Sequence, residues 1–357
     1  MAATAGFRER ARHVDRSELI ALGAILLVYL ALVVFQLRNH RHPNFDERIF
    51  LDVGRQITLT GLPYRTYNIY RPALFFDHTP LYVYWVAAVT FLGGPTVELV
   101  RATTLAVGVL SLLGVHLIGR TLRGPAAGLV GAAVLATNPF YATLSWFVRM
   151  EVPLCCALIF ALLALIHRRW LFAGLLIAAA VLLKEIALGF MAVAAVYVVL
   201  TSGLRAALAV GVPSLAALGA WFAYAAAIGQ TQLLSVFHRW FISAAGGKLD
   251  DPRMHVSLRV WAQTIVTEVI SLTGILATGA AGALALLDRR SIPRIVFVPI
   301  AYIAFAVASS FLITLKEPRY LIAAIPMLAI TVALVADWDR FVRTIRSPAA
   351  EGRGTAA

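Results

Sequence analysis

The chain has 357 residues, of which 61% are hydrophobic and only 14% are charged, and its formal net charge is +13. A soluble domain carries about 45–50% apolar and about 25% charged residues, so this composition excludes an ordinary water-soluble core. The positive charge does not indicate nucleic-acid binding either, because the basic residues are scattered through short loops between apolar runs, as membrane insertion requires.

Apolar runs that suit spanning helices recur along most of the chain. The first follows an arginine-rich segment and lacks a small-residue cleavage site, so we expect an uncleaved helix rather than a signal peptide. The two cysteines, Cys155 and Cys156, are adjacent and match neither a disulfide framework nor a metal-ligand spacing. The expected spans are 18–37, 97–119, 125–141, 152–167, 170–183, 185–201, 206–228, 262–287, 294–315 and 320–336. The sequence therefore predicts an all-α polytopic membrane protein with about ten transmembrane helices.

The apolar run 80–93 is ambiguous, and the distribution of positive charge decides how we interpret it. If this run does not cross, the short loops around Arg120, Arg168 and Arg290 lie on the same side as the N-terminal arginines, as the positive-inside rule requires. We therefore expect 80–93 to be a juxtamembrane or re-entrant helix on the outer face. The expected domains are a cytoplasmic tail 1–17, a transmembrane domain 18–336 and a cytoplasmic tail 337–357.

The first outer loop, 38–96, holds the most suggestive polar residues. Asp46 and Glu47 precede an amphipathic pattern, which predicts a helix lying on the membrane surface with its apolar side down. Its apolar positions are Ile49, Phe50, Val53 and Ile57, and a Gly-Leu-Pro turn from Gly61 ends it. Asp46 can serve as the helix N-cap, or as a carboxylate base at the mouth of a membrane site, and the two roles are compatible.

Further ionisable residues map to the same outer face. Asp77 and His78 can bind phosphate, bind a metal or orient a sugar, although a solvated loop explains them equally simply. Single cations near the hydrocarbon can also snorkel to the interface, but several acids and bases together suit a phosphate ligand. These residues are Arg101, Arg149, Glu151, Lys184 and Arg319. A second long outer loop, 229–261, contains Gly246-Gly247 and can act as a lid.

Several segments, in this order, resemble the GT-C superfamily of membrane glycosyltransferases, closest to its protein O-mannosyltransferase and aminoarabinose-transferase-like branch. They are FDER, DHTPLYVYW, NPFYATLSWFVRMEVPL, Lys184 between two short spans, and KEPRYLIAAIPML. The resemblance runs from about residue 20 to residue 336 and implies a GT-C fold with outer juxtamembrane helices. Two positions depart from the family pattern: Glu151 stands where an Asp is more frequent, and Thr79 where a Pro is.

The resemblance also implies roles for individual residues. Asp46 matches the catalytic base, and Glu151 matches a second acid that follows Arg149. The implied catalytic residues are Asp46, Glu47 and Glu151; those implied to contact the donor phosphate are Arg319, Tyr320, Lys184, His78 and Arg101; those implied to orient the substrate are Asp77 and Arg149.

The implied activity is inverting transfer of a sugar from a polyprenyl-phosphate donor to a hydroxyl of a lipid, glycan or protein acceptor. The Ala- and Arg-rich composition suggests a bacterium, so the expected location is the bacterial inner membrane, with the site facing the periplasm or the cell exterior. No nucleotide-binding fingerprint is present. A divalent metal is possible, with Asp77 and His78 as candidate ligands. A transporter or flippase of a lipid-linked sugar remains an alternative, but its charges should lie near the midplane. A non-catalytic membrane scaffold is the second alternative.

Overall fold

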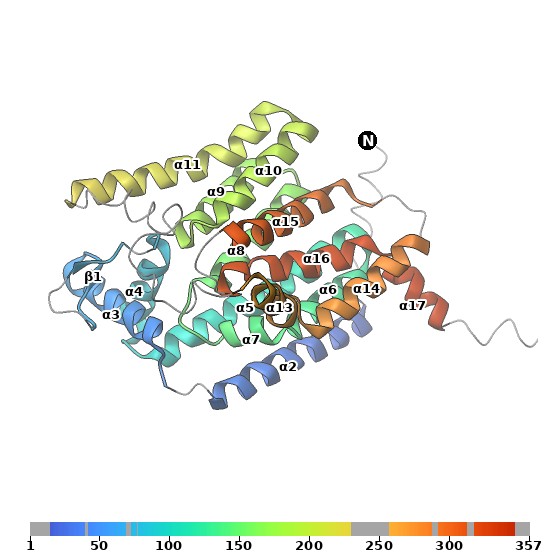
Figure 1. The fold of residues 1–357 in the computed structure, drawn as a ribbon, viewed down its shortest axis with the longest axis horizontal. Coiled ribbons are helices and arrows are strands. Elements are labelled where there is room, and N and C mark those ends of the chain that lie inside the picture. The colour runs from blue at the N-terminus through green and yellow to red at the C-terminus, as the bar shows by residue number, and fades with distance from the viewer. Residues whose placement is uncertain are drawn as a thin grey trace, which may run out of the picture.

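The computed structural model describes residues 15–39, 42–68, 73–76, 78–229, 257–287, 292–312 and 318–346. This part of the chain contains fifteen α-helices and one two-stranded antiparallel sheet. Most helices run roughly along the long axis of the molecule (Figure 1). The elements of the first outer loop gather at one end, and the last helix lies at the opposite end. The all-α prediction is confirmed.

Among the described residues, three helices are long and apolar enough to cross a membrane: α2 (Arg16–Asn39), α5 (Val97–Arg123) and α11 (Leu204–Ala227). A fourth candidate span is a bent pair with a 79° angle, formed by α13 (Leu258–Thr264), a π-helical turn (Ile265–Ile270) and α14 (Ser271–Leu287). The other expected spans are shorter apolar helices in the described residues. They are α6 (Pro125–Ala136), α8 (Glu151–Ile166), α9 (Trp170–Leu183), α10 (Ala187–Ser202), α15 (Phe297–Leu312) and α16 (Ala324–Val335). The part of the chain that the structure describes thus has three or four candidate spans of full length, which fits an integral membrane protein.

One expected span, 125–141, is wrong because it is two helices. α6 ends at Ala136, and the six-residue α7 (Pro139–Leu144) follows. The Asn138 side chain caps α7 by accepting a hydrogen bond from the Tyr141 backbone N–H at 2.8 Å. Pro139 suits the first helical position because its missing N–H would be unpaired there in any case.

The break between α9 and α10 occurs where two short spans were predicted to meet. Lys184 adopts an extended conformation and ends α9. The turn closes when the backbone N–H of Ala187 donates to the Lys184 carbonyl at 3.1 Å. Both helices pack against α11, which lies along the same side of the bundle. The turn therefore presents Lys184 at the end of the bundle that carries the first outer loop.

The first outer loop forms α3 (Phe45–Thr60), β1 (Tyr64–Arg65), β2 (Ala73–Leu74) and α4 (Leu81–Gly93). Gly61 ends α3 with a φ of 77°, a left-handed conformation that glycine adopts without penalty. The predicted amphipathic helix is confirmed, with Ile49, Phe50 and Val53 buried. Its apolar side, however, packs on α4 and on Phe75 rather than facing the membrane surface as expected.

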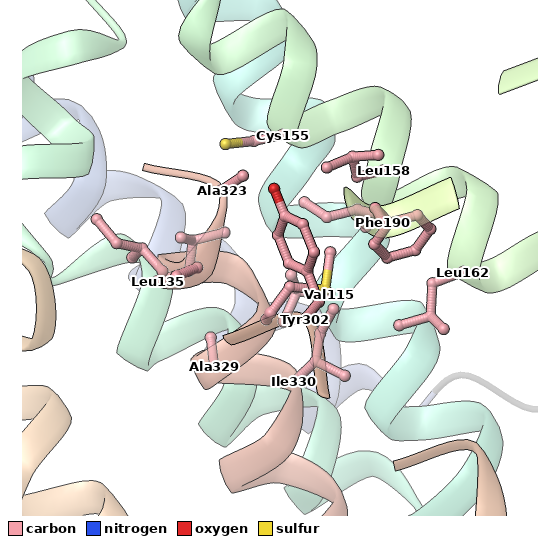
Figure 2. Packing of buried hydrophobic residues seen from close by; sticks show 14 of the residues in the cluster. Val115, Leu135, Cys155, Leu158, Leu162, Phe190, Tyr302, Ala323, Ala329 and Ile330 are labelled. Atoms are coloured by element: carbon pink, nitrogen blue, oxygen red, sulfur yellow. The ribbon is translucent and has the colours of Figure 1, made fainter. Parts of the chain in front are cut away.

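The largest hydrophobic cluster joins α5, α6, α8, α10, α15 and α16 (Figure 2). Tyr302 of α15 lies at its centre, with its ring centroid 5.5 Å from that of Phe190 of α10 in an edge-on arrangement. Helices from the first and last thirds of the chain thus share one core. The 3₁₀ turn η4 (Pro318–Leu321) precedes α16 and packs on α15 and on the π-helical turn Ile265–Ile270, while α16 itself packs on α8.

Part of the expected C-terminal tail is helical. α17 (Trp338–Arg346) follows α16, and the Asp339 carboxylate accepts a hydrogen bond from the Ala126 backbone N–H at the start of α6, at 2.9 Å. Arg123 at the end of α5 donates to the Leu334 carbonyl at 2.9 Å. These contacts tie the α5–α6 turn to the end of α16, so the tail 337–357 begins as a docked helix.

Candidate active site

Asp46 stands in the first turn of α3, whose start is fixed by a capping box. The Asn44 side chain accepts from the Glu47 backbone N–H at 3.0 Å, and the Asn44 backbone N–H donates to the Glu47 carboxylate at 2.9 Å. Asn44, not Asp46, is therefore the N-cap, which leaves the Asp46 carboxylate available for other contacts. The signal was present in the sequence, since Asn44 and Glu47 have the spacing of a capping box.

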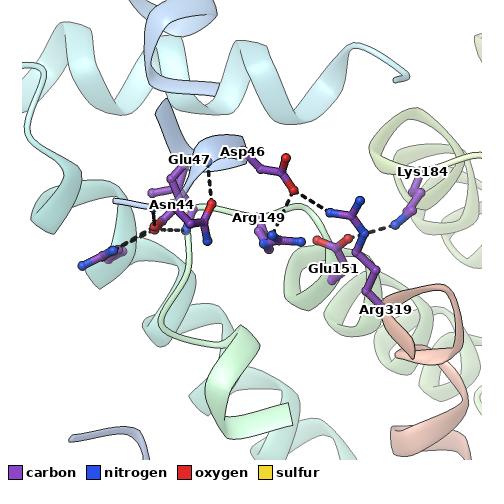
Figure 3. Close-up of polar contacts among 9 residues, drawn as sticks. Asn44, Asp46, Glu47, Arg149, Glu151, Lys184 and Arg319 are labelled. Atoms are coloured by element: carbon purple, nitrogen blue, oxygen red, sulfur yellow. Dashed lines mark hydrogen bonds and ion pairs between the residues drawn. The ribbon is translucent and has the colours of Figure 1, made fainter. Parts of the chain in front are cut away.

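The Asp46 carboxylate meets two arginines from distant parts of the chain. Its Oδ2 accepts from Arg149 at 2.9 Å and from Arg319 at 2.5 Å (Figure 3). Arg149 precedes α8, and Arg319 lies in η4. The Asp46 side chain is 30% exposed, so the contact is open to solvent on one side. A carboxylate with an exposed edge and two guanidiniums around one oxygen defines the centre of the candidate site.

A second ion pair lies beside this contact and is almost completely buried. Lys184 Nζ donates to Glu151 Oε1 at 2.9 Å, and both side chains are about 3% exposed or less. Glu151 begins α8, and Lys184 ends α9. Glu151 Oε2 has no hydrogen-bond partner among the described residues although it is buried, so this carboxylate keeps an acceptor position unused. Figure 3 shows both side chains on the same side of the site as Arg319.

Glu47 and Arg101, two expected site residues, instead bind each other away from this cluster. The Arg101 guanidinium donates two hydrogen bonds of 2.8 Å to the Glu47 carboxylate, and the Val148 backbone N–H donates a third at 2.9 Å. Glu47 is fully buried and Arg101 is 2% exposed. The pair ties the start of α3 to α5 and to the segment before α8. This geometry fits a structural pair that positions Asp46 better than a catalytic acid and a phosphate ligand.

His78 is held in an apolar niche between two phenylalanine rings. Its ring centroid lies 6.2 Å from that of Phe50 and 6.3 Å from that of Phe75. Burial, followed by the positive charge of Lys184, lowers the pKa of His78 to about 3. The imidazole is therefore neutral at physiological pH and supplies no positive charge to a phosphate. This differs from the phosphate-contact role that the sequence implied for His78. It can still give or accept one hydrogen bond.

Three expected residues or segments lie wholly or partly outside the described residues. Asp77 and the stretch 230–256 of the second outer loop are outside them, and α13 begins at Leu258 just after that stretch. Tyr320 belongs to η4, but the structure does not describe its side chain. Among the described residues, no group of three or more His, Cys, Asp or Glu side chains is arranged to hold a metal ion.

The charged cluster has a small surplus of positive charge. Two carboxylates, Asp46 and Glu151, face three cations, Arg149, Lys184 and Arg319, which leaves one net positive charge. The sequence predicted that these five residues share one face, and the structure places the Asp46 contacts and the Glu151–Lys184 pair next to each other (Figure 3). The arrangement is suited to receive one anionic group next to an exposed carboxylate.

Comparison with known proteins identifies the class of protein that has this fold. The structure of ArnT from Cupriavidus metallidurans bound to undecaprenyl phosphate superposes with a TM-score of 0.67 at 16% identity, covering 90% of this chain and 62% of ArnT. Its apo form gives a TM-score of 0.67 at 15% identity, covering 89% of this chain and 59% of ArnT. The archaeal oligosaccharyltransferase AglB from Archaeoglobus fulgidus, in complex with an inhibitory peptide and a dolichol-phosphate, gives a TM-score of 0.53 at 17% identity, covering 96% of this chain and 53% of AglB.

The fold is therefore similar to that of ArnT and AglB. More particularly, residues 77–229 match the family of dolichyl-phosphate-mannose-protein mannosyltransferases. No curated protein matches the chain. The chain spans about three fifths of the length of the ArnT chain that it resembles.

Proposed function

We propose that this protein transfers a sugar from a polyprenyl-phosphate donor to an acceptor hydroxyl, with inversion at the sugar carbon and Asp46 as the base. The observation that carries this proposal is the contact of one exposed carboxylate with Arg149 and Arg319. The acceptor hydroxyl needs a group that takes its proton, and the leaving phosphate needs positive charge. The cluster contains both within one network of contacts. The family match and the lipid phosphates bound by ArnT and AglB support the same donor class.

The charge of the cluster matches the proposed donor. A sugar joined to a polyprenyl chain through one phosphate is a phosphodiester with a single negative charge, and the cluster has one positive charge in surplus. Arg319 is 25% exposed, so it can reach an incoming ligand. Lys184 is buried and already neutralised in part by Glu151. Arg319 is therefore the first phosphate contact in this scheme, and Lys184 stabilises the phosphate as its charge grows.

The same geometry gives an order to the steps. Asp46 Oδ2 accepts from two guanidiniums, so its lone pairs are occupied by them. A donor phosphate that binds Arg319 draws it from Asp46 and frees the oxygen for the acceptor hydroxyl. The hydroxyl oxygen then attacks the sugar carbon from the side opposite the phosphate, and its proton passes to Asp46. The bond between the sugar carbon and the phosphate oxygen breaks, and its electron pair leaves with the polyprenyl phosphate.

We further propose that the chain crosses the membrane about ten times, with the short apolar helices completing the bundle. Both termini would be cytoplasmic, and α3, α4 and the charged cluster would face the periplasm or the cell exterior. The placement of α17 and of α3 at opposite ends of the bundle supports this orientation (Figure 1), as does Arg123, which donates to the Leu334 carbonyl near the start of α17. Labelling of single cysteines from outside intact cells tests it. Asp46→Cys should react and Arg123→Cys should not, and the reverse pattern would refute the orientation.

The function is tested with the purified full-length protein in detergent, using a membrane-lipid extract as the source of polyprenyl-phosphate sugars. Transfer in detergent requires no second compartment, so it also separates an enzyme from a transporter. We expect Asp46→Asn to lower the rate by about 10²–10⁴-fold, the usual contribution of a positioned base. The matched control is Glu98→Gln, which alters an exposed carboxylate in the first turn of α5. Equal rates in the two variants would remove Asp46 from the mechanism.

A further inference from the structure

An exposed aromatic patch lies beside the charged cluster and has no part in the scheme above. It consists of Phe45, Tyr67, Arg48 and Arg65, which we call the α3 patch. Phe45 immediately precedes Asp46 and is 51% exposed. Its ring centroid lies 6.1 Å from that of Tyr67 at an interplanar angle of 58°, and the Arg65 guanidinium carbon lies 5.9 Å from the Phe45 ring centroid. Arg48 donates to the Tyr67 hydroxyl at 3.2 Å.

The patch is held in place by a buttressed turn. Both Asp52 carboxylate oxygens accept from Thr66, through its backbone N–H at 2.6 Å and its hydroxyl at 2.5 Å, and one also accepts from the Tyr67 backbone N–H at 2.8 Å. Arg65 Nε donates to the Tyr67 carbonyl at 3.1 Å. The Tyr67 ring and the Arg65 guanidinium are thus fixed before any ligand arrives, which reduces the ordering cost of binding.

The surroundings of the patch indicate water rather than lipid. Phe45, Arg48, Asp52 and Arg55 recur at three- and four-residue intervals, so they share one face of α3. That face carries a carboxylate and two guanidiniums, whereas the opposite face supplies the buried apolar residues of α3. The patch also lies at the end of the bundle where β1 and α3 gather (Figure 1). Phe45 is thus a half-exposed apolar ring on a charged face, one residue from the proposed base.

We propose that the α3 patch binds a sugar ring of the acceptor, so that the acceptor is a glycan or a glycosylated headgroup. This inference rests on the proposed function and names the acceptor class. A sugar ring has an apolar C–H face and a rim of hydroxyls. The Phe45 ring offers an apolar face to the former, while the Arg48 and Arg65 guanidiniums and the Tyr67 hydroxyl offer donors to the latter. Phe45 and Asp46 share the first turn of α3, so a sugar ring on the patch lies within one helical turn of the carboxylate.

The test uses the full-length protein in detergent micelles and saturation-transfer NMR. Protein aromatic protons are saturated, and transfer to the C–H protons of added mannotriose and maltotriose is recorded, with a hexapeptide containing Ser and Thr as the comparison probe. We expect transfer to at least one trisaccharide and little to the peptide. Phe45→Leu should reduce that transfer about fivefold, the order expected for loss of one aromatic contact. Phe91→Leu is the matched control, because Phe91 is 78% exposed and lies at the far end of α4.

The outcomes separate this inference from the proposed function. Asp46→Asn should keep the trisaccharide signal, because the ring contact does not need the carboxylate. In the transfer assay, Phe45→Leu should raise the KM for the acceptor about fivefold while the KM for the donor stays near the wild-type value. An unchanged signal in Phe45→Leu, equal losses in Phe45→Leu and Phe91→Leu, or preferential binding of the peptide would each overturn the sugar subsite. Absence of any sugar transfer by the wild type would instead refute the proposed function.

Discussion

The buried pair of Glu47 and Arg101 provides the sharpest prediction about how the site is supported. The Glu47 carboxylate accepts four hydrogen bonds, two from Arg101 and one each from the Val148 and Asn44 backbone N–H groups. Arg101→Met removes the two charge-assisted bonds and leaves a buried carboxylate with only neutral partners. Removing one member of a buried ion pair costs about 3–5 kcal/mol. We therefore expect Arg101→Met to lower the free energy of unfolding by that amount.

Equilibrium unfolding of the purified protein in mixed detergent micelles measures this loss, and a double-mutant cycle isolates its cause. Glu47→Gln keeps the acceptor oxygen and removes the charge, so the double variant Glu47→Gln/Arg101→Met no longer buries an unpaired carboxylate. The double variant should therefore be more stable than Arg101→Met alone, with a coupling energy above 1 kcal/mol in magnitude, within the range of about 0.5–3 kcal/mol seen for contacting residues. Additive effects of the two substitutions would refute the pair as a structural unit. Wild-type stability in Arg101→Met would refute its burial.

The remaining predictions concern packing, protonation and the second ion pair. An added Cβ on Gly119 would lie 2.8 Å from the Gly128 Cα, so Gly119→Leu should force α5 and α6 apart and lower the midpoint of unfolding. A Cβ on Gly211 would meet open space, so Gly211→Leu should leave the midpoint unchanged. The folded-state pKa of His78 is about 3, below the ordinary value of about 6.5, so the neutral imidazole stabilises the fold fully above pH 6.5 and this stabilisation is lost as the pH falls towards 3. Between pH 7 and pH 5 the free energy of unfolding of the wild type should therefore fall by about 1–2 kcal/mol more than that of His78→Gln. An equal fall in both proteins would contradict this. Lys184→Met leaves Glu151 buried without its cation and should cost about 3–5 kcal/mol, while Lys184→Met/Glu151→Gln should recover part of that loss, as measured by the same unfolding assay.

Much of the architecture could be predicted because the membrane limits the choices. Long apolar runs gave the helices, and the pattern of Ile49, Phe50 and Val53 gave the buried side of α3. The number of full-length spans was harder, because an apolar run shows neither where a helix breaks nor how it bends. Asn138 and Pro139 divide one run into two helices through a local cap. The 79° bend between α13 and α14 has no proline or glycine at the break to signal it.

The site was predicted in composition but not in pairing. The topology placed Asp46, Arg149, Glu151, Lys184 and Arg319 on one face, and the structure brings them together. Partner choice depends on side-chain direction, which the sequence does not contain. The neighbours Asp46 and Glu47 point to different partners because successive residues of a helix diverge.

Burial was the other property that escaped prediction. The residue type of His78 suggests a group that can be charged near neutral pH. Phe50 and Phe75 exclude water from its ring. Phe50 is distant in the sequence, and the nearby Phe75 follows no pattern that indicates contact with His78. Arg101 likewise looked like a phosphate ligand because it is a cation near the outer end of a span. Its partner, Glu47, lies 54 positions away.

The most direct test of the central claim is a paired measurement of donor affinity and single-turnover transfer in Asp46→Asn. The uncharged side chain no longer holds Arg319, so the labelled polyprenyl-phosphate sugar should bind at least as tightly as to the wild type, while its sugar stays untransferred. If Asp46→Asn loses both donor binding and sugar transfer, Asp46 has a structural role. If the variant transfers the sugar at the wild-type rate, another group takes the proton.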